Sequence, residues 1–405
     1  MRIFFFNRYL PPDHSATSQL LGDLARHLAE GGSQVVLVGS RQRYDDATAM
    51  LPRNERIDGF DVVRVGGTRF GRDSLAGRAL DYASYFLGAA RVLWFQVGRG
   101  DTVVLMTDPP MLGALLGPLA RWRGARCVNW LQDLFPEVAQ ALLGRSVRLL
   151  GAPLRWLRDQ GVRTAACNVV ICEGMAGRLV ARGVDRKRLA IIENWTDDNA
   201  IQPMPAQDNP LRRQWGLQEK FVVGHSGNLG RAHDWRTMLD AATALRGRAD
   251  IHFVMIGGGN GLEAFAAEAA QRGLENVSLH PYQSRDALVH SLSVPDLHWL
   301  SLHPALEGCI LPSKLYGIRA AGRAALFIGA TDGEVATRLR DTATGFAVAP
   351  GDASGARAGI ERLADDRAQA HAMGARARAD LKPRTAALAL WRGLLDSPWP
   401  RQPLP

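Results

Sequence analysis

Short apolar runs alternate along the whole chain with stretches in which apolar residues recur at helical spacing. A short apolar run bounded by turn residues predicts a buried strand, and its regular alternation with helical patterns predicts parallel sheets built from βαβ units. The pattern therefore predicts an α/β protein with two Rossmann-like domains that face each other across a cleft. The strands are expected near residues 3–6, 35–38, 103–106, 127–131, 169–172, 190–192, 221–224, 252–256, 277–279, 297–300 and 325–328.

Prolines mark the boundary between the two domains. Pro203, Pro205 and Pro210 fall within residues 194–218, which we interpret as a linker. A chain of 405 residues also suits two domains of roughly 200 residues each. We expect an N-terminal domain over residues 1–198, a C-terminal domain over 199–385 and a helical tail over 386–405.

The loop after the first predicted strand leads into an amphipathic helix that ends at Gly31. The apolar face of this helix consists of Leu20, Leu21, Leu24 and Leu28. Ligands of open α/β sheets bind at the carboxyl ends of the strands, so the loop is expected to point toward the cleft. Asp13 and His14 in this loop are candidate binding residues, and a solvent-exposed capping turn is the alternative.

Composition indicates a protein of the cytoplasm. The chain is 46% hydrophobic and 22% charged, and no apolar run reaches the ~20 residues needed to cross a bilayer. The first residues predict a strand and not a signal peptide. Four cysteines without paired spacing predict buried thiols in a reducing compartment and no metal site.

The net charge of +9 is concentrated in one region, because residues 121–163 contain eight arginines against three acidic residues. Trp122, Trp130 and Trp156 accompany them, together with several leucines. Basic residues beside Trp and Leu suit an anionic membrane surface. Nucleic acid would use the same charges, but no zinc-finger or RNA-binding signature is visible. An arginine-rich composition without a partner is the alternative.

The stretch from Leu302 to Gly329 combines a carboxylate with the start of a short helix. Glu307 lies in a turn, and Ser313 is expected to cap a helix that ends at Gly322. The free N–H groups of the first helical turn, with Lys314 beside them, predict a seat for an anion such as a diphosphate. The alternative is an ordinary connection with a surface Glu and Lys.

Two glycine-rich turns and one acidic turn follow other predicted strands. Residues 222–235 include Gly227, Asn228 and Arg231, where glycines allow backbone amides to approach an anion and Arg231 adds a fixed charge. Gly257 and Gly258 begin a second glycine run, but it lacks the acidic residue that a dinucleotide loop needs about 20 residues later.

The acidic turn comprises residues 129–137 and places Asp133 and Glu137 just after a strand. An Asp at this place can serve chemistry, and it can also cap a helix.

These motifs, in this order, resemble those of the family 4 retaining glycosyltransferases of GT-B fold, particularly a bacterial branch that makes surface polysaccharides. The resemblance covers nearly the whole chain. It implies catalytic roles for Glu307, which would hold the donor sugar, for Asp133 and for Lys314. It also implies that the tail containing Trp391 crosses back to the first domain.

The resemblance further assigns the binding residues. The donor would be bound by Gly227, Asn228, Arg231, Gly257, Gly258, Tyr282, Gln283 and Ser313, and the acceptor side would include Asp13, His14 and Glu137. The chain departs from the family pattern at Gly317, where a second Glu is usual, and at Asn228 and His233, where an Arg and a Lys are usual.

The implied reaction transfers a sugar from a UDP- or GDP-sugar with retention, without a cofactor or a bound metal. The implied acceptor is a polyprenyl-diphosphate-linked saccharide at the inner face of an anionic membrane, in exopolysaccharide, capsule or O-antigen synthesis. Two alternatives stay open, a nucleotide-sugar epimerase of the same fold and a non-catalytic member of a polysaccharide assembly complex.

Overall fold

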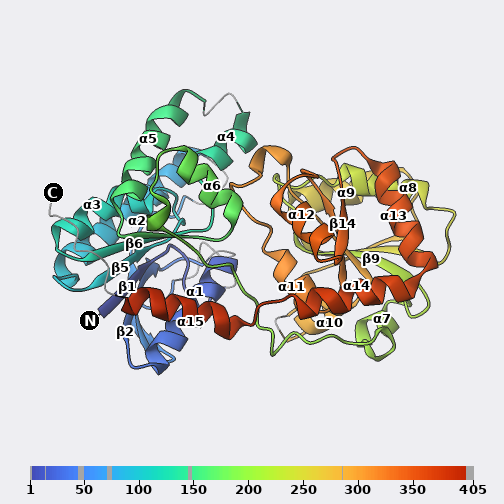
Figure 1. Cartoon of the computed structure of the whole chain (residues 1–405), viewed down its shortest axis with the longest axis horizontal. Coiled ribbons are helices and arrows are strands. Elements are labelled where there is room, and N and C mark those ends of the chain that lie inside the picture. The colour runs from blue at the N-terminus through green and yellow to red at the C-terminus, as the bar shows by residue number, and fades with distance from the viewer. Residues whose placement is uncertain are drawn as a thin grey trace. The chain divides into compact units, whose positions relative to one another are not determined.

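Two sheets surrounded by helices make up the protein, and each sheet belongs to a separate unit (Figure 1). Unit 1 comprises residues 1–194 and 385–405, and unit 2 comprises residues 195–384. The computed structural model describes residues 2–13, 15–43, 50–70, 75–144, 148–284 and 286–397. The sequence predicts domain boundaries after residues 198 and 385, and the chain passes between the units after Asn194 and Arg384.

The sheet of unit 1 has the strand order β3-β4-β2-β1-β5-β6-β7-β8, and its neighbouring strands are parallel except for the β3–β4 pair. The strands are β1 (Arg2–Phe6), β2 (Gln34–Ser40), β3 (Asn54–Ile57), β4 (Phe60–Val65), β5 (Thr102–Leu105), β6 (Arg126–Leu131), β7 (Cys167–Val170) and β8 (Leu189–Ile191). The helices are α1 (Ala16–Glu30), α2 (Leu75–Gln96), α3 (Leu112–Trp122), α4 (Glu137–Leu143), α5 (Arg148–Thr164), α6 (Glu173–Ala181) and α15 (Arg384–Asp396), with the 3-10 turn η2 (Arg186–Arg188).

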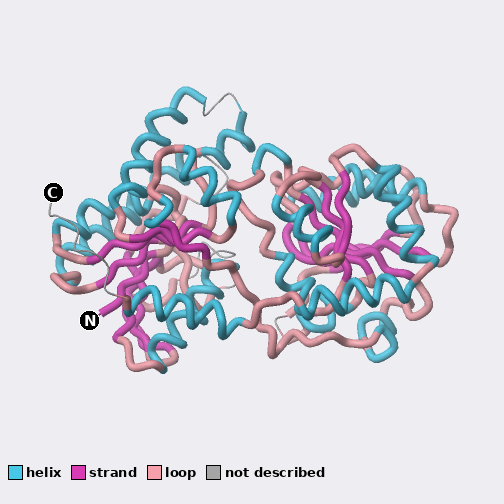
Figure 2. The backbone as a smooth tube through the Cα atoms, viewed as in Figure 1, coloured by secondary structure: helices cyan, strands magenta, loops and turns pink. Residues whose placement is uncertain are grey.

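The sheet of unit 2 is parallel, with the strand order β11-β10-β9-β12-β13-β14 (Figure 2). The strands are β9 (Phe221–Asn228), β10 (Ile251–Gly258), β11 (Val277–His280), β12 (Leu297–Ser301), β13 (Ala324–Ile328) and β14 (Gly345–Val348). The helices are α7 (Pro210–Gln214), α8 (Arg236–Ala244), α9 (Asn260–Gln271), α10 (Leu288–Ser293), α11 (Lys314–Ala320), α12 (Glu334–Asp341), α13 (Ala353–Asp365) and α14 (Arg367–Ala379), with the 3-10 turns η3 (Ala206–Asp208) and η4 (Pro304–Leu306).

The two parallel sheets confirm the predicted α/β architecture with two Rossmann-like domains, and every predicted strand is present. Three further strands, β3, β4 and β14, were not predicted. In β3 every residue is exposed or half-buried, in β4 such residues interrupt the buried ones, and β14 has only one buried residue. A search for continuous apolar runs misses such strands, because they are buried on one face at most.

The two faces of the unit 1 sheet are covered by different helices. Phe4 and Phe6 of β1 share a buried cluster with Tyr85 of α2 and Leu116 of α3, so these two helices cover one face. Trp130 of β6 faces the other way and packs on Trp391 of α15, with ring centroids 4.6 Å apart. Thus α15 lies on the face opposite to α2 and α3.

This packing corrects one prediction. Trp130 is fully buried and does not belong to an exposed basic surface. The predicted apolar face of the first helix is confirmed, because its four leucines are buried in α1, which ends at Gly31. Gly322 ends α11 with a φ of +64°, a conformation that favours glycine.

Candidate functional site

In each sheet the chain first adds strands on one side of the first strand of the sheet and then crosses to the other side of that strand, and we call this crossing the reversal point. In unit 2 the chain runs from β9 outward through β10 to β11 and then returns to β12 on the other side of β9. In unit 1 the corresponding point lies between β1 and β5. Ligands of open α/β sheets bind at such points, outside the carboxyl ends of the strands. The candidate residues are therefore considered at these two places.

Lys314 lies at the reversal point of unit 2. It is the first residue of α11, and its Nζ donates a hydrogen bond to the carbonyl oxygen of Asn228 at 2.9 Å. A Cβ placed on Gly227 would lie 2.9 Å from Cε of Lys314, so the lysine crosses directly over the end of β9. Burial lowers the pKa of Lys314 to about 8. Its ammonium thus keeps its charge at neutral pH while it is poorly hydrated.

Two neutral histidines lie beside this lysine. Nδ1 of His233 is 2.6 Å from the carbonyl oxygen of Ser301, and Nδ1 of His225 is 3.3 Å from the carbonyl oxygen of Trp299. A carbonyl only accepts, so each Nδ1 carries the proton and each Nε2 is an acceptor. Burial, followed by the charge of Lys314, lowers the pKa of His233 to about 4 and that of His225 well below its usual value.

The glycine-rich ends of β9 and β10 extend as a pair beyond the rest of the sheet. Gly227 pairs with Gly257, and Asn228 pairs with Gly258. Gly257 has a φ of +137°, and a Cβ there would lie 2.2 Å from the carbonyl oxygen of Gly227. A side chain at Gly257 is therefore incompatible with this strand pairing.

Tyr282 and Gln283 follow β11. The ring of Tyr282 lies against Gly258, where a Cβ would come within 2.9 Å of it, and 60% of the side chain remains exposed. Gln283 donates to the carbonyl oxygen of Pro281 at 2.9 Å. The tyrosine thus presents an open aromatic surface near the ends of β10 and β11.

The loop after β12 places Glu307 at the start of another helix. Its Oε1 accepts from the backbone N–H of Glu334, the first residue of α12, at 2.8 Å. A carboxylate is favourable at a helix N-terminus, and the bond fixes its orientation. Ser313, in contrast, differs from its prediction. It has helical backbone angles and its side chain makes no cap hydrogen bond to α11.

Two other residues of unit 2 bear on the predicted donor site, the candidate Arg231 and Gly317, where the chain departs from the family pattern. Arg231 is exposed, and no ion pair is found for it within the described part of the chain. A Cβ on Gly317 would lie 3.2 Å from Cδ1 of Leu292, so this position contacts α10 where the family pattern would place a carboxylate.

A pocket in unit 1 contains Asp133. It has an empty volume of about 390 Å³ and lies at the carboxyl ends of β5 and β6, with Thr107, Asn129, Leu112 and Arg158 among its lining residues. Burial raises the pKa of Asp133 to about 6, although a hydrogen bond with Thr107 opposes the increase. Oδ1 of Asp133 is buried and has no hydrogen-bond partner within the described residues. This oxygen is available to accept a hydrogen bond.

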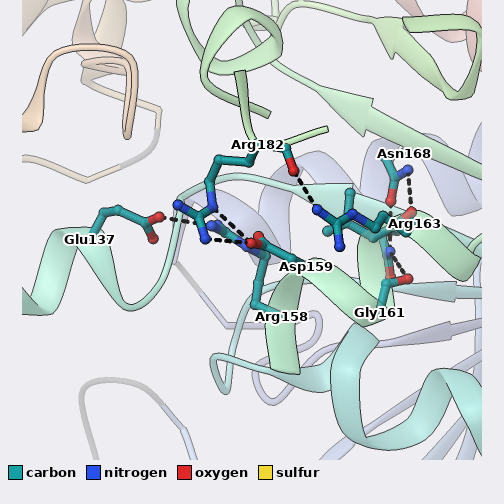
Figure 3. A network of polar contacts seen from close by, with 9 residues as sticks. Glu137, Arg158, Asp159, Gly161, Arg163, Asn168 and Arg182 are labelled. Carbon is teal, nitrogen blue, oxygen red and sulfur yellow. Dashed lines mark hydrogen bonds and ion pairs between the residues drawn. The ribbon is translucent and has the colours of Figure 1, made fainter. Parts of the chain in front are cut away.

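Glu137 belongs to a network of ion pairs (Figure 3). It lies 2.7 Å from Arg158, which is 2.7 Å from Asp159, and Asp159 is in turn 2.7 Å from Arg182. Arg158 is only 6% exposed. Arg158 is one of the eight arginines of residues 121–163 that we expected at a membrane surface. For this residue the expectation is wrong, because it is buried and pairs with two carboxylates inside the unit.

Asp13 is 4% exposed, so the loop before α1 does not present it in a solvent-exposed turn. Its Oδ1 accepts from the backbone N–H of Ser15 at 2.8 Å, and Ser15 itself caps α1. His14 lies outside the described residues.

Several residues of these sites had no signal in the sequence. Folding brings Thr107 into hydrogen-bonding contact with Asp133 and places Arg158 in the lining of the same pocket. It also brings His225 close enough to Lys314 for the charge of the lysine to lower the pKa of the histidine. Within the described residues, no group of three or more metal-ligating side chains is present.

Comparison with known proteins assigns a description to each half of the chain. Residues 17–195 match the model of the glycosyl transferase 4-like domain, and residues 207–380 match that of the glycosyl transferases group 1. The chain is 30% identical to the putative colanic acid biosynthesis glycosyl transferase WcaI of Escherichia coli over 236 residues, which is 57% of each protein. It is 26% identical to the probable glycosyltransferase WbjE of Pseudomonas aeruginosa over 263 residues, 63% of this chain and 64% of that relative. The matches thus cover less than two thirds of these relatives.

Solved structures of similar fold cover nearly the whole chain. A sucrose-phosphate synthase from Thermosynechococcus elongatus has a TM-score of 0.77 at 15% identity and covers 98% of this chain and 99% of its own. Anabaena HepE, solved with UDP and glucose, has a TM-score of 0.72 at 14% identity, and the match covers 98% of this chain and 100% of HepE. WaaG, described as a glycosyltransferase of lipopolysaccharide biosynthesis, has a TM-score of 0.72 at 14% identity. The match covers 98% of this chain and 100% of WaaG.

Proposed function

Because the chain belongs to the glycosyltransferases of GT-B fold, with a 4-like domain followed by a group 1 domain, we propose that it transfers a sugar from a UDP- or GDP-sugar to a polyprenyl-diphosphate-linked saccharide. The relatives named for colanic acid biosynthesis and for lipopolysaccharide biosynthesis support a role in bacterial surface polysaccharides. The similar structures solved with UDP and UDP-glucose support a nucleotide-sugar donor.

The observation that most strongly supports this function is Lys314 at the reversal point of unit 2. Its ammonium lies against the glycine-rich end of β9, and with a pKa of about 8 it is cationic at pH 7. A poorly hydrated cation at a fixed position stabilises negative charge that develops on a leaving diphosphate. Arg231 contributes a second, exposed cation from the turn after β9.

We assign one carboxylate of each unit to substrate binding, and the transfer proceeds with retention at the anomeric carbon. Glu307 binds hydroxyl groups of the donor sugar, and its bond to the start of α12 keeps the carboxylate in place. As the bond from the anomeric carbon to the diphosphate breaks, the acceptor oxygen bonds to that carbon on the same face. The departing phosphate oxygen accepts the proton of the acceptor, and Asp133 positions a hydroxyl group through its free Oδ1.

The test is Lys314→Ala. We expect turnover to fall by about 100-fold or more, because the charge on the diphosphate loses its main cation. Release of UDP or GDP in the presence of acceptor measures turnover. Lys187→Ala, which removes an exposed lysine of unit 1, is the matched control and should leave turnover unchanged. Full turnover in a folded Lys314→Ala protein would show that the assignment is wrong.

Nucleotide binding separates this function from the alternatives. UDP or GDP at ~100 times its dissociation constant should stabilise the protein by about 2.7 kcal/mol in thermal unfolding, whereas ADP and NAD should not. A sugar nucleotide that is converted without any acceptor would identify an epimerase. Stabilisation without any nucleotide release would identify a non-catalytic protein.

A further inference from the structure

The outward face of α2 is almost entirely apolar. Its exposed positions are Ala76, Ala79, Leu80, Ala83, Leu87, Arg91, Trp94, Phe95 and Gln96, of which one is charged. Leu87 is 75% exposed and Phe95 is 69% exposed. The inward face of the same helix is buried in the core through Tyr85 and Leu93. A helix that is apolar on both sides normally has a non-aqueous partner on each.

The apolar surface continues on α3, which packs on the same face of the sheet. Leu115 and Trp122 of α3 are 47% and 56% exposed. The rings of Trp94 and Trp122 stack with centroids 4.6 Å apart and an interplanar angle of 14°, which joins the two helices at the surface. We define the α2–α3 face as the exposed residues Leu80, Leu87, Trp94 and Phe95 of α2 together with Leu115 and Trp122 of α3. Contiguous apolar patches of this kind mark interaction sites.

The charges around the α2–α3 face are positive. The guanidinium of Arg91 lies 5.0 Å from the ring centroid of Phe95, and that of Arg123 lies 5.7 Å from that of Trp94. Residues 75–126 contain six arginines and three aspartates. Asp81 and Asp101 are buried, where they pair with Arg8 and Arg2 of β1 and the loop after it. No carboxylate is exposed on the described residues of α2 and α3.

This combination selects one kind of partner. At the surface of an anionic bilayer, Trp, Phe and Leu enter the boundary of the acyl chains while Arg meets the phosphates of the headgroups. The exposed apolar positions of α2 from Leu80 to Trp94 extend over about 21 Å at the rise of an α-helix. The helix can therefore lie parallel to the membrane surface with all of these side chains in contact with lipid. Within the described residues, no helix has the length and apolar character needed to span a membrane.

We propose that the α2–α3 face is the surface by which this protein binds the anionic leaflet of a membrane. The inference extends the proposed function, on which it rests for the lipid-linked acceptor. Of the surface that the sequence assigned to a membrane, the proposal keeps Trp122 and Arg123 and leaves out the buried Trp130 and Arg158. It adds α2, which the sequence did not single out. Binding comes from the exposed aromatic and leucine side chains together with Arg91 and Arg123.

The test is co-sedimentation of the full chain with vesicles of phosphatidylcholine, alone or mixed with phosphatidylglycerol. The wild type should bind the mixed vesicles and bind pure phosphatidylcholine more weakly. Leu87→Glu combined with Phe95→Glu should weaken binding to mixed vesicles by about tenfold or more, because carboxylates enter the interface and repel the lipid. Both side chains are exposed, so the fold should be retained.

Leu390→Glu is the matched control, because Leu390 is 57% exposed on α15, on the opposite face of the sheet. It should bind vesicles like the wild type. Equal vesicle binding by wild type and the double variant would overturn the proposal. So would a dimer in size-exclusion chromatography that the double variant converts to monomer, since the face would then join two copies of the chain.

The outcome can be separated from that of the proposed function. Stabilisation of the double variant by UDP or GDP reports on unit 2 without any membrane. If the nucleotide stabilises both proteins and neither binds vesicles, only the membrane proposal fails. If vesicles bind as expected and no nucleotide stabilises either protein, only the donor assignment fails.

Discussion

The two units have similar architectures and different surfaces. Each has a parallel sheet with helices on both faces, and each has a densely buried core. Of the large apolar side chains that are exposed within the described residues, eleven belong to unit 1 and two, Leu279 and Tyr282, belong to unit 2. The outer helix α13 of unit 2 instead exposes Ser354, Arg357, Ala358, Arg362 and Asp365.

The fold does not require this difference, because the same layer of helices is apolar outside in one unit and polar outside in the other. Burial inside a unit explains why a sheet and its helices hold together, but it does not explain exposed Trp and Phe side chains. The surfaces therefore report what each unit meets. In our proposals unit 2 meets a small charged nucleotide sugar and unit 1 meets a lipid.

Among substitutions that should affect one unit and not the other, the largest loss of stability is expected from Trp391→Ala. Trp391 is fully buried against Trp130, so its loss should lower the free energy of unfolding of unit 1 by about 3–5 kcal/mol. Denaturant unfolding followed by tryptophan fluorescence measures this change. Stabilisation of unit 2 by nucleotide should persist. A variant as stable as the wild type would show that α15 is not part of the unit 1 core.

A smaller loss of stability, in unit 2 and not in unit 1, is expected from Gly257→Ala. The substitution puts a Cβ 2.2 Å from the carbonyl oxygen of Gly227 at a φ of +137°, which should cost about 1–3 kcal/mol. Affinity for UDP or GDP should fall while vesicle binding stays normal. Gly247→Ala is the control, since a Cβ there meets nothing within 4 Å. Equal stability of both variants would contradict the close approach of β9 and β10.

The smallest effect is expected from Asp133→Asn and depends on pH. The pKa of Asp133 is raised to about 6 in the folded protein, above the ordinary value of about 3.9. Between these two pH values the folded state binds more protons than the unfolded state. The free energy of unfolding therefore falls as the pH rises through this window. Asp133→Asn should therefore unfold less readily at pH 7, by about 1–2 kcal/mol, and match the wild type near pH 3.

Urea unfolding at pH 3, 5 and 7 measures this difference. A variant that is less stable at pH 7 would show that the ionised Asp133 is stabilised by a partner. Such a result would also weaken the role of its buried Oδ1 as an open acceptor.

Much of the fold could be predicted because continuous apolar runs identify strands that are buried on both faces. The runs that formed β1, β5 and β13 are examples, whereas β3, β4 and β14 lacked such runs. Glycines also predicted the ends of α1 and α11 correctly, and at Gly322, which follows α11, the positive φ explains why a glycine is suited to the helix end.

The site was predicted only in part. The order of motifs placed Lys314 near Gly227, and the structure brings the two into contact. Burial could not be inferred from residue type, so Trp130 and Arg158 were assigned to a surface although both are buried. The exposed apolar face of α2 was not predicted, since a sequence does not tell which apolar residues remain outside. Charge pairing across distant segments, as in Arg158 with Glu137, is equally hidden.

The return of the last helix to unit 1 affects how the protein can be made. Unit 2 is a continuous segment, so all of it can fold soon after residue 384 leaves the ribosome. Unit 1 is completed only after unit 2 has been synthesised, because Trp391, which covers Trp130, follows residue 384 in the chain. During synthesis unit 2 can therefore be folded while unit 1 still exposes Trp130 and the surface on which α15 packs.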